Sequence, residues 1–143
     1  MGYKYVNHTA DVEFVASGKN VEEAFSNAML ALFDTIADIR TARKSGRKKS
    51  SFRISEKSDN LNDLLWLALQ DCLSVSDAKG VYAHSVKSIS IKEKGDKRML
   101  SATLSAVEED PSLSKIYVKG ISRFDLSVKA TKGGYAARAV LDV

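Results

Sequence analysis

The fold class is decided by residues 81–107, VYAHSVKSISIKEKGDKRMLSATLSAV. Apolar and polar residues alternate along 81–92 and again along 100–107, which is the period of a strand with one buried face. Gly95-Asp96 lies between the two runs and favours a tight turn. This stretch therefore predicts an antiparallel hairpin.

Upstream of this hairpin, strand-like and helix-like segments alternate. Apolar residues alternate with polar ones over 12–16 and over 51–55, which predicts two short strands. Between them, apolar residues recur at helical spacing after Asn20, and Glu23 three residues later makes Asn20 a suitable N-cap. We expect this helix to end near Ile39.

A second helix is predicted after Ser58 or Asp59, either of which could cap it. A broad apolar stripe is expected to face the core, whereas Trp66 and Leu67 lie outside that stripe. These two side chains are either deeply buried or offered to a partner, and the sequence leaves both interpretations open. The stripe consists of Leu61, Leu64, Leu65, Ala68, Leu69, Cys72 and Leu73.

The last third of the chain is predicted to consist of strands. Pro111 interrupts the alternation after the first hairpin, because proline cannot donate to a strand ladder. A last hairpin is expected from about 118–130 and 135–143, with its turn at 132–134. The order of elements predicts a single α+β domain over 1–143, with a mixed or antiparallel sheet and two main helices packed on it.

Composition excludes several classes of protein. The hydrophobic fraction of 44% is ordinary for a globular chain, and no apolar stretch reaches the length that spans a bilayer. The first residues lack the apolar segment of a signal peptide, so we expect a cytoplasmic protein without a membrane partner. Cys72 is the only cysteine, which rules out an internal disulfide or a thiolate metal cluster.

Positive charge is concentrated between residues 40 and 49, where six cations occur without an acid. Such a block can contact RNA phosphates. A solvated loop is the plainer interpretation, because no aromatic residue is interleaved to stack on bases. Beside Arg40, the possible RNA contacts are Arg43, Lys44, Arg47, Lys48 and Lys49.

We find no motif for a catalytic residue. The chain lacks a GxxxxGK[ST] phosphate loop, a GxGxxG fingerprint and a GxSxG nucleophile elbow. Its two histidines, His8 and His84, are too few for a histidine-based zinc site without other ligands, and they lie too far apart in sequence to form a local motif. His84 lies in a predicted strand and is expected to be a half-buried structural residue.

Acidic oxygens occur near both ends of the chain. Asp11 lies near the start, and Asp142 precedes the C-terminal carboxylate of Val143. If the two ends meet, these oxygens form an anionic pocket that a hard cation would neutralise. Lys119 could also balance them. Alternatively, Asp11 caps a turn and Asp142 is a solvated chain end.

Four segments carry a resemblance to a known family. They are YVNHTADV at 5–12, VEEAFSNA at 21–28, VKG at 118–120 and ARAVLDV at 137–143. In this order and over nearly the whole chain, they resemble the archease family. The HTAD start combined with an ARxVLD[IV] end is specific to that pattern.

The resemblance implies an accessory protein, not an enzyme. Archeases promote guanylylation and turnover of the tRNA-splicing RNA ligase, which joins tRNA exons through a guanylylated histidine; contact with tRNA itself would be indirect or weak. The family binds a divalent cation, taken as calcium, near the chain termini, which falls here on Asp11, Asp142 and the main-chain oxygen of Val143. Lys119 matches a functionally required lysine, and His8 is a further candidate for partner contact.

The chain departs from the family pattern at two places. Asn7 stands where the family usually has an aspartate, and Ser122-Arg123-Phe124 replaces a segment that more often reads Thr-Tyr-His. We expect the missing acid to weaken cation affinity, and the missing histidine removes a candidate ligand or partner contact.

Two other classes of function stay open from the residues alone. An RNA-binding or chaperone-like module would use the basic block and Trp66, and its RNA affinity would fall steeply with salt without needing the ligase. An independent metal-dependent enzyme, such as a phosphohydrolase, would show turnover without any partner.

Overall fold

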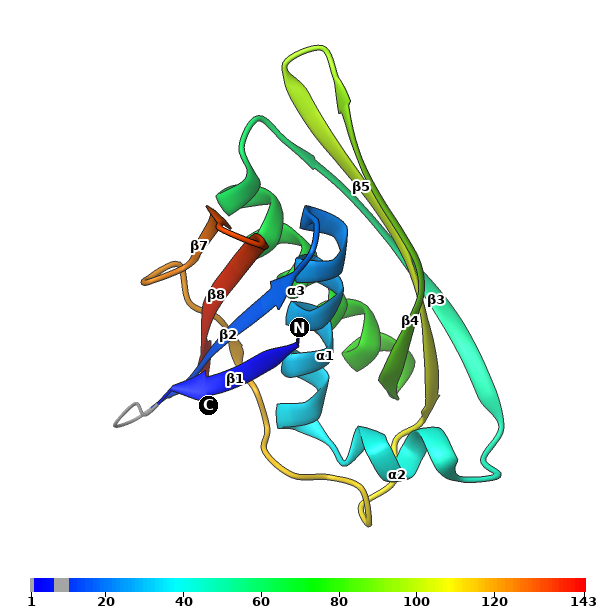
Figure 1. The fold of residues 1–143 in the computed structure, drawn as a ribbon. Helices are drawn as coiled ribbons and strands as arrows, with labels where there is room; N and C mark the ends of the chain where they lie inside the picture. Colours follow the sequence, from blue (N-terminus) through cyan, green and yellow to red (C-terminus); the bar gives the residue numbers. More distant parts are fainter. Residues whose placement is uncertain (1, 7–10) are drawn as a thin grey trace.

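Two antiparallel sheets lie on either side of the helices in the computed structural model, which describes residues 2–6 and 11–143 (Figure 1). The larger sheet has the order β1 (Tyr3–Val6), β2 (Val12–Gly18), β8 (Gly134–Asp142) and β6 (Gly120–Ile121), and β7 (Ser127–Thr131) also pairs with β8. The smaller sheet has the order β3 (Lys49–Ser58), β5 (Lys97–Glu108) and β4 (Val81–Lys94). The helices are α1 (Val21–Ile36), α2 (Ile39–Lys44) and α3 (Leu61–Lys79). The predicted α+β class is confirmed, with its strands divided between two sheets.

The β4–β5 hairpin confirms the prediction made from residues 81–107. Both strands are longer than the alternation indicated, and they are joined at Lys94↔Lys97 across Gly95-Asp96. Gly95 has a φ of 65°, a left-handed conformation that glycine adopts without steric cost. The turn therefore sets the register next to it, whereas two irregularities, at Ala83/Ser85 and at Val86/Ser88, shift the register farther along β4.

The helix starts follow local capping rules. The Asn20 side chain accepts a hydrogen bond from the Glu23 amide at 2.8 Å, as predicted for α1. The prediction of Ser58 or Asp59 as the second cap was wrong. Ser58 still belongs to β3, and Asn60 caps α3 by accepting from the Asp63 amide at 2.8 Å.

The segment after α1 also differs from the prediction. The helix ends at Ile36 instead of near Ile39, because Ala37 is extended and forms a bridge with Ser114, far along the chain. Asp38 then caps the separate helix α2. The predicted basic loop at 40–49 is therefore wrong in part, since its first half is helical and its last residue begins β3.

The core lies between the sheets and uses the predicted helical stripes. Phe25 and Met29 of α1 are fully buried, as are Leu65 and Leu69 of α3. Each large apolar side chain buried in this way contributes about 1.5–3 kcal/mol relative to exposure. Phe14 from β2 joins the same buried cluster, so the larger sheet is held on the helices from its inner face.

The last hairpin is only partly as predicted. β7 and β8 pair as expected, with Thr131↔Gly134 at their turn. The expectation of one continuous strand from 118 was wrong, because β6 pairs only two residues with the far end of β8 and the chain then leaves the sheet until Ser127. β1, which the alternation pattern did not predict, adds an edge strand beside β2.

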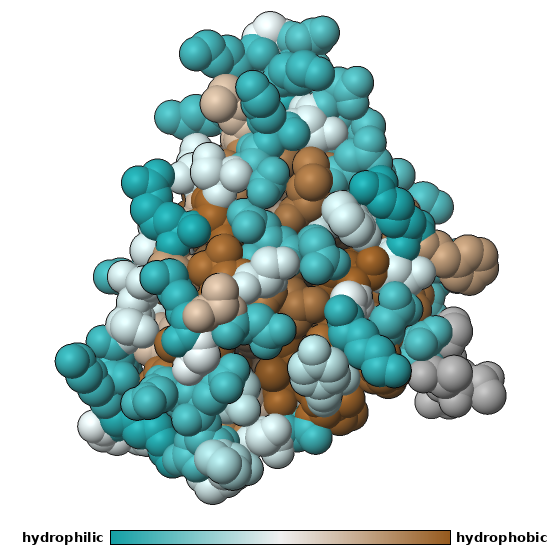
Figure 2. Space-filling model, turned by 180° about the vertical axis from the view of Figure 1, so that it is seen from behind, coloured by the Kyte–Doolittle hydropathy of each residue, from teal (hydrophilic) through white to brown (hydrophobic). Residues whose placement is uncertain are grey.

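The surface is mostly hydrophilic, with hydrophobic residues visible along the middle of the face opposite to Figure 1 (Figure 2). In the described part of the chain, no helix is both long enough and apolar enough to span a bilayer. Among residues 2–6 and 11–143, the exposed large hydrophobic residues are Tyr5, Met99, Ile116, Tyr117 and Phe124.

Candidate functional site

The pairing of β2 with β8 brings the two acidic ends of the chain together. Val12 lies opposite Leu141 in this antiparallel ladder. Asp11 directly precedes Val12 and Asp142 directly follows Leu141, so the two aspartates occupy neighbouring positions at one end of the sheet. Figure 1 shows the C-terminus at this end, close to β1 and β2.

Lys119 reaches the same end of the sheet through β6. Its amide donates a hydrogen bond to the Asp142 main-chain oxygen at 2.7 Å, and Gly120 pairs with Asp142 in the ladder. Val118 and Ile121 are buried on either side, which anchors the segment and leaves the Lys119 side chain exposed. The ammonium group is thereby presented to solvent beside the paired chain ends.

The remaining predicted site residues are Val143 and His8. Val143 is half-buried and packs against the hydrophobic core, so the chain end is tied to the sheet. His8 lies outside the described residues. In the described part of the chain, no group of three or more His, Cys, Asp or Glu side chains is suited to hold a metal.

The donor set at the chain ends nevertheless fits a hard cation. Asp11 and Asp142 supply carboxylates and Val143 a main-chain oxygen, and oxygen atoms of both kinds are the ligands that Ca²⁺ takes in proteins. Two carboxylates are fewer than such an ion prefers, so further oxygens would have to come from water or from a partner.

A pocket of about 330 Å³ adjoins Asp11. It lies between β1, the end of α1 and the extended segment at Lys115, and it is mostly apolar with a few polar groups, as ligand pockets commonly are. Its lining residues are Tyr5, Val6, Asp11, Val12, Asp34, Thr35, Lys115 and Ile116.

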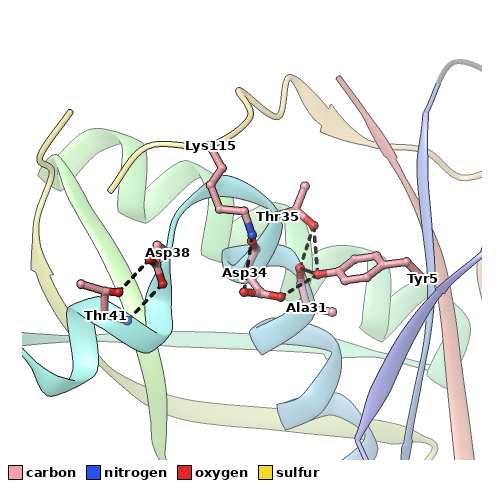
Figure 3. Close-up of polar contacts among 7 residues, drawn as sticks. All are labelled: Tyr5, Ala31, Asp34, Thr35, Asp38, Thr41 and Lys115. Carbon is pink, nitrogen blue, oxygen red and sulfur yellow. Dashed lines mark hydrogen bonds and ion pairs between the residues drawn. The ribbon is translucent and has the colours of Figure 1, made fainter. Parts of the chain in front are cut away.

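The polar wall of this pocket was not anticipated from the sequence (Figure 3). The Tyr5 hydroxyl donates toward the Ala31 carbonyl at 3.0 Å and the Asp34 carboxylate at 3.2 Å. Lys115 donates to the Asp34 main-chain oxygen, and its Nζ lies 3.7 Å from Oδ1 of Asp34. Burial raises the pKa of the Tyr5 hydroxyl, so it stays a neutral donor at physiological pH. These residues lie far apart in sequence, and no local pattern connects them.

Two arginines of the predicted RNA-contact block form contacts with other residues of this chain. The Arg43 guanidinium donates to the His84 carbonyl and to the Ser85 hydroxyl, the latter at 3.2 Å. Arg47 forms an ion pair with Asp110 at 2.9 Å. The side chains of Lys44, Lys48 and Lys49 are exposed. RNA contact by this block stays a prediction.

His84 and Cys72 are both buried. His84 is more buried than expected, at 2% exposed, and burial lowers the pKa of its imidazole. Cys72 is fully buried in α3, and burial raises the pKa of its thiol, which disfavours the reactive thiolate. Neither side chain contributes to the end of the sheet where Asp142 lies.

Comparison with known proteins identifies the family. Residues 3–143 match the model of the Archease protein family (MTH1598/TM1083). The chain belongs to the archease family. Protein archease of Methanosarcina mazei is 30% identical over 99% of this chain and 95% of its own length. Protein archease of Aeropyrum pernix is 26% identical over 99% of this chain and 97% of its own.

Solved archease structures share the fold. The solution structure of Methanobacterium thermoautotrophicum protein 1598 superimposes with a TM-score of 0.83 at 26% identity, covering 99% of both chains. The crystal structure of a Thermotoga maritima archease, described as a possible chaperone, gives a TM-score of 0.62 at 17% identity over 98% of this chain and 96% of its own. The latter likeness concerns the fold alone.

Proposed function

We propose that this archease-family protein activates the tRNA-splicing RNA ligase by promoting its guanylylation and turnover. The protein itself would be an accessory factor without a catalytic residue of its own. The proposal is supported by family membership over nearly the whole chain and by one structural observation. That observation is the register of Val12 with Leu141, which makes Asp11 and Asp142 neighbours.

The proposed site would hold a divalent cation, with calcium as the first candidate. Asp11 and Asp142 would provide carboxylate oxygens and Val143 its main-chain oxygen. Such an ion would supply positive charge close to the phosphates of a nucleotide triphosphate bound by the ligase. The donors lie at one end of the sheet, where a partner can approach them and complete the coordination with its own oxygens.

Lys119 has a separate role in this proposal. Its amide holds the main chain of Asp142, while its exposed ammonium is a compact point charge suited to a phosphate oxygen. The residue would thus both fix the geometry of the chain end and add charge where triphosphate oxygens arrive. His8 stays a candidate for partner contact on the strength of the family pattern.

The test is guanylylation of the purified ligase with and without this protein, with each divalent ion in turn. We expect the wild-type protein to stimulate the reaction. Asp142→Asn should reduce the stimulation by about 10-fold or more, since loss of a cation-supporting group typically costs 10–100-fold. Asp96→Asn, at the exposed β4–β5 turn, is the control and should stimulate like the wild type.

Two results would contradict the proposal in different ways. Full stimulation by both Asp11→Asn and Asp142→Asn would remove the cation site while leaving the activator role. No stimulation by the wild type with any ion would remove the activator role. Thermal unfolding of each variant shows whether a lost effect merely reflects a lost fold.

A further inference from the structure

Phe124 is an exposed aromatic residue on a turn that is anchored to α3. Phe124 lies in the segment between β6 and β7, and its side chain is 69% exposed. In Figure 1 this segment, coloured orange, projects from the edge of the larger sheet beside β7. A phenyl ring exposed on an ordered turn is available to pack against an apolar surface, which would remove its area from water.

Helix α3 fixes the main chain on both sides of the turn. The Trp66 indole Nε1 donates to the Ile121 carbonyl at 2.8 Å, and the Gln70 side chain accepts from the Ile121 amide at 3.3 Å. After the turn, the Asn62 side chain accepts from the Val128 amide at 2.8 Å. Three side chains of one helix thus hold both ends of the segment.

The turn itself is also constrained. The Arg123 guanidinium lies 4.0 Å from the centroid of the Trp66 ring, a cation–π contact. The Phe124 amide donates to the Ser122 hydroxyl at 3.0 Å. Asp125 has a φ of 56°, which is strained for a residue with a side chain and is the kind of conformation that collects at binding sites. The main chain that carries Phe124 is therefore held in a defined conformation.

We propose that Phe124 is a docking anchor that inserts into an apolar socket on the ligase. This inference rests on the proposed function for the identity of the partner. A rigid aromatic side chain loses little conformational freedom on binding, and such residues dominate the energy of protein interfaces. The hydrogen bonds from α3 fix the main chain on both sides of the turn from which the ring projects.

The acidic residues that follow Phe124 and pair with Arg123 favour a protein socket over RNA. Asp125 follows Phe124 directly, and Asp63 lies 3.7 Å from the Arg123 guanidinium, whose charge it offsets. Carboxylates at these positions repel the phosphate groups of a nucleic acid. This repulsion disfavours stacking of the ring on a base. The complementary socket is apolar at its centre with cationic side chains at its rim.

Phe124 lies close enough to the paired chain ends for one ligase surface to contact both. Phe124 is five residues from Lys119, so these two residues can be at most about 18 Å apart. The Lys119 amide in turn bonds to the main chain of Asp142. One partner surface of ordinary size can cover both. Phe124 would supply affinity, whereas the cation site would act on the bound nucleotide.

The experiment measures the affinity of the intact ligase for the full-length protein by calorimetry, in the absence of RNA. Phe124→Ala should weaken binding about 10-fold or more, as loss of an interface anchor does. Met99→Ala removes another exposed hydrophobic side chain, from β5, and should bind like the wild type. At saturating concentration, Phe124→Ala should regain full stimulation of guanylylation, because the cation site is intact.

Each other result is decisive. Wild-type affinity of Phe124→Ala overturns the docking inference and leaves the proposed function standing. Unchanged ligase affinity with a loss of single-stranded RNA binding would instead assign the ring to RNA and also overturn it. If the wild-type protein neither binds nor stimulates the ligase, both the proposed function and the docking inference are wrong.

Discussion

Single charged residues show how this molecule divides its charges between internal contacts and solvent. Glu13 of β2 is 5% exposed, and Arg138 of β8 lies 3.1 Å from its carboxylate across the ladder. Arg47 is similarly committed to Asp110. Part of the positive charge that the sequence suggests for RNA contact is thus neutralised by ion pairs within the protein.

The Arg47–Asp110 pair predicts a pH dependence of stability. The hydrogen bond from Arg47, helped by the Ser112 amide, lowers the pKa of the Asp110 carboxyl to about 2 from its ordinary value of 3.8. A depressed pKa in the folded state means that the stabilisation is complete above about pH 4 and is lost as the pH falls toward 2. Asp110→Asn should therefore lower the urea midpoint at pH 7, and the difference should shrink toward pH 2.

The exposed Asp96 provides the control for this measurement. Asp96→Asn should leave the urea midpoint unchanged at both pH values. An Asp110→Asn deficit of equal size at pH 7 and pH 2 would show that ionisation of this carboxyl is not what stabilises the fold.

At the scale of the secondary-structure elements, the main chain approaches closely where β2 connects to α1. Gly18 ends β2 against the first turn of α1, where an added Cβ would lie 2.4 Å from the Ala24 amide nitrogen and 2.6 Å from the Glu23 Cβ. Both contacts are far shorter than atoms tolerate. This close approach lets β2 pack its inner face on the helix.

Substitution of Gly18 tests this packing. Gly18→Ala should destabilise the protein by about 1–3 kcal/mol, because backbone and helix must shift to admit the methyl group. Gly46→Ala is the matched control, since an added Cβ there meets nothing within 4 Å. It should change the free energy of unfolding by no more than about 0.5 kcal/mol in a urea titration. Equal effects of the two substitutions would contradict the close approach.

The whole molecule is organised as two sheets that share one buried layer of helices. α1 packs against β2 and β8 of the larger sheet and against β4 of the smaller one. α3 contacts β3 on one side and β6 and β7 on the other. The helices therefore couple the chain ends, where the candidate site lies, to the rest of the fold.

Cys72 reports on the integrity of this layer. Because its thiol is fully buried and its pKa is raised, a thiol reagent should modify the native protein only when it unfolds globally. The labelling rate should rise with urea in parallel with the unfolded fraction. Ser74→Cys, exposed on the same helix, should add one thiol that reacts at once. Fast native labelling of Cys72 itself would mean that the layer opens locally.

Several features followed from the sequence because their causes are local. The helical stripes that include Phe25 and Leu69 are buried as predicted, since a 3.6-residue period places them on one face whatever the partner. Asn20 caps its helix because its side chain bonds an amide three residues away. The 81–107 hairpin depends on strand alternation and a glycine turn.

Other features depend on contacts between residues far apart in sequence, and only the tertiary structure shows them. The Ala37–Ser114 bridge ends α1 at Ile36, before the predicted end near Ile39, and α2 forms where a loop was predicted. The Ile121 carbonyl gives Trp66 the partner that its own helix could not provide. Asp11 and Asp142 were candidates from their chemistry and from family resemblance, but only the β2–β8 register makes them neighbours. Periodicity specifies which face a residue occupies; it carries no information about which distant strand lies opposite, because that depends on the packing of the entire core.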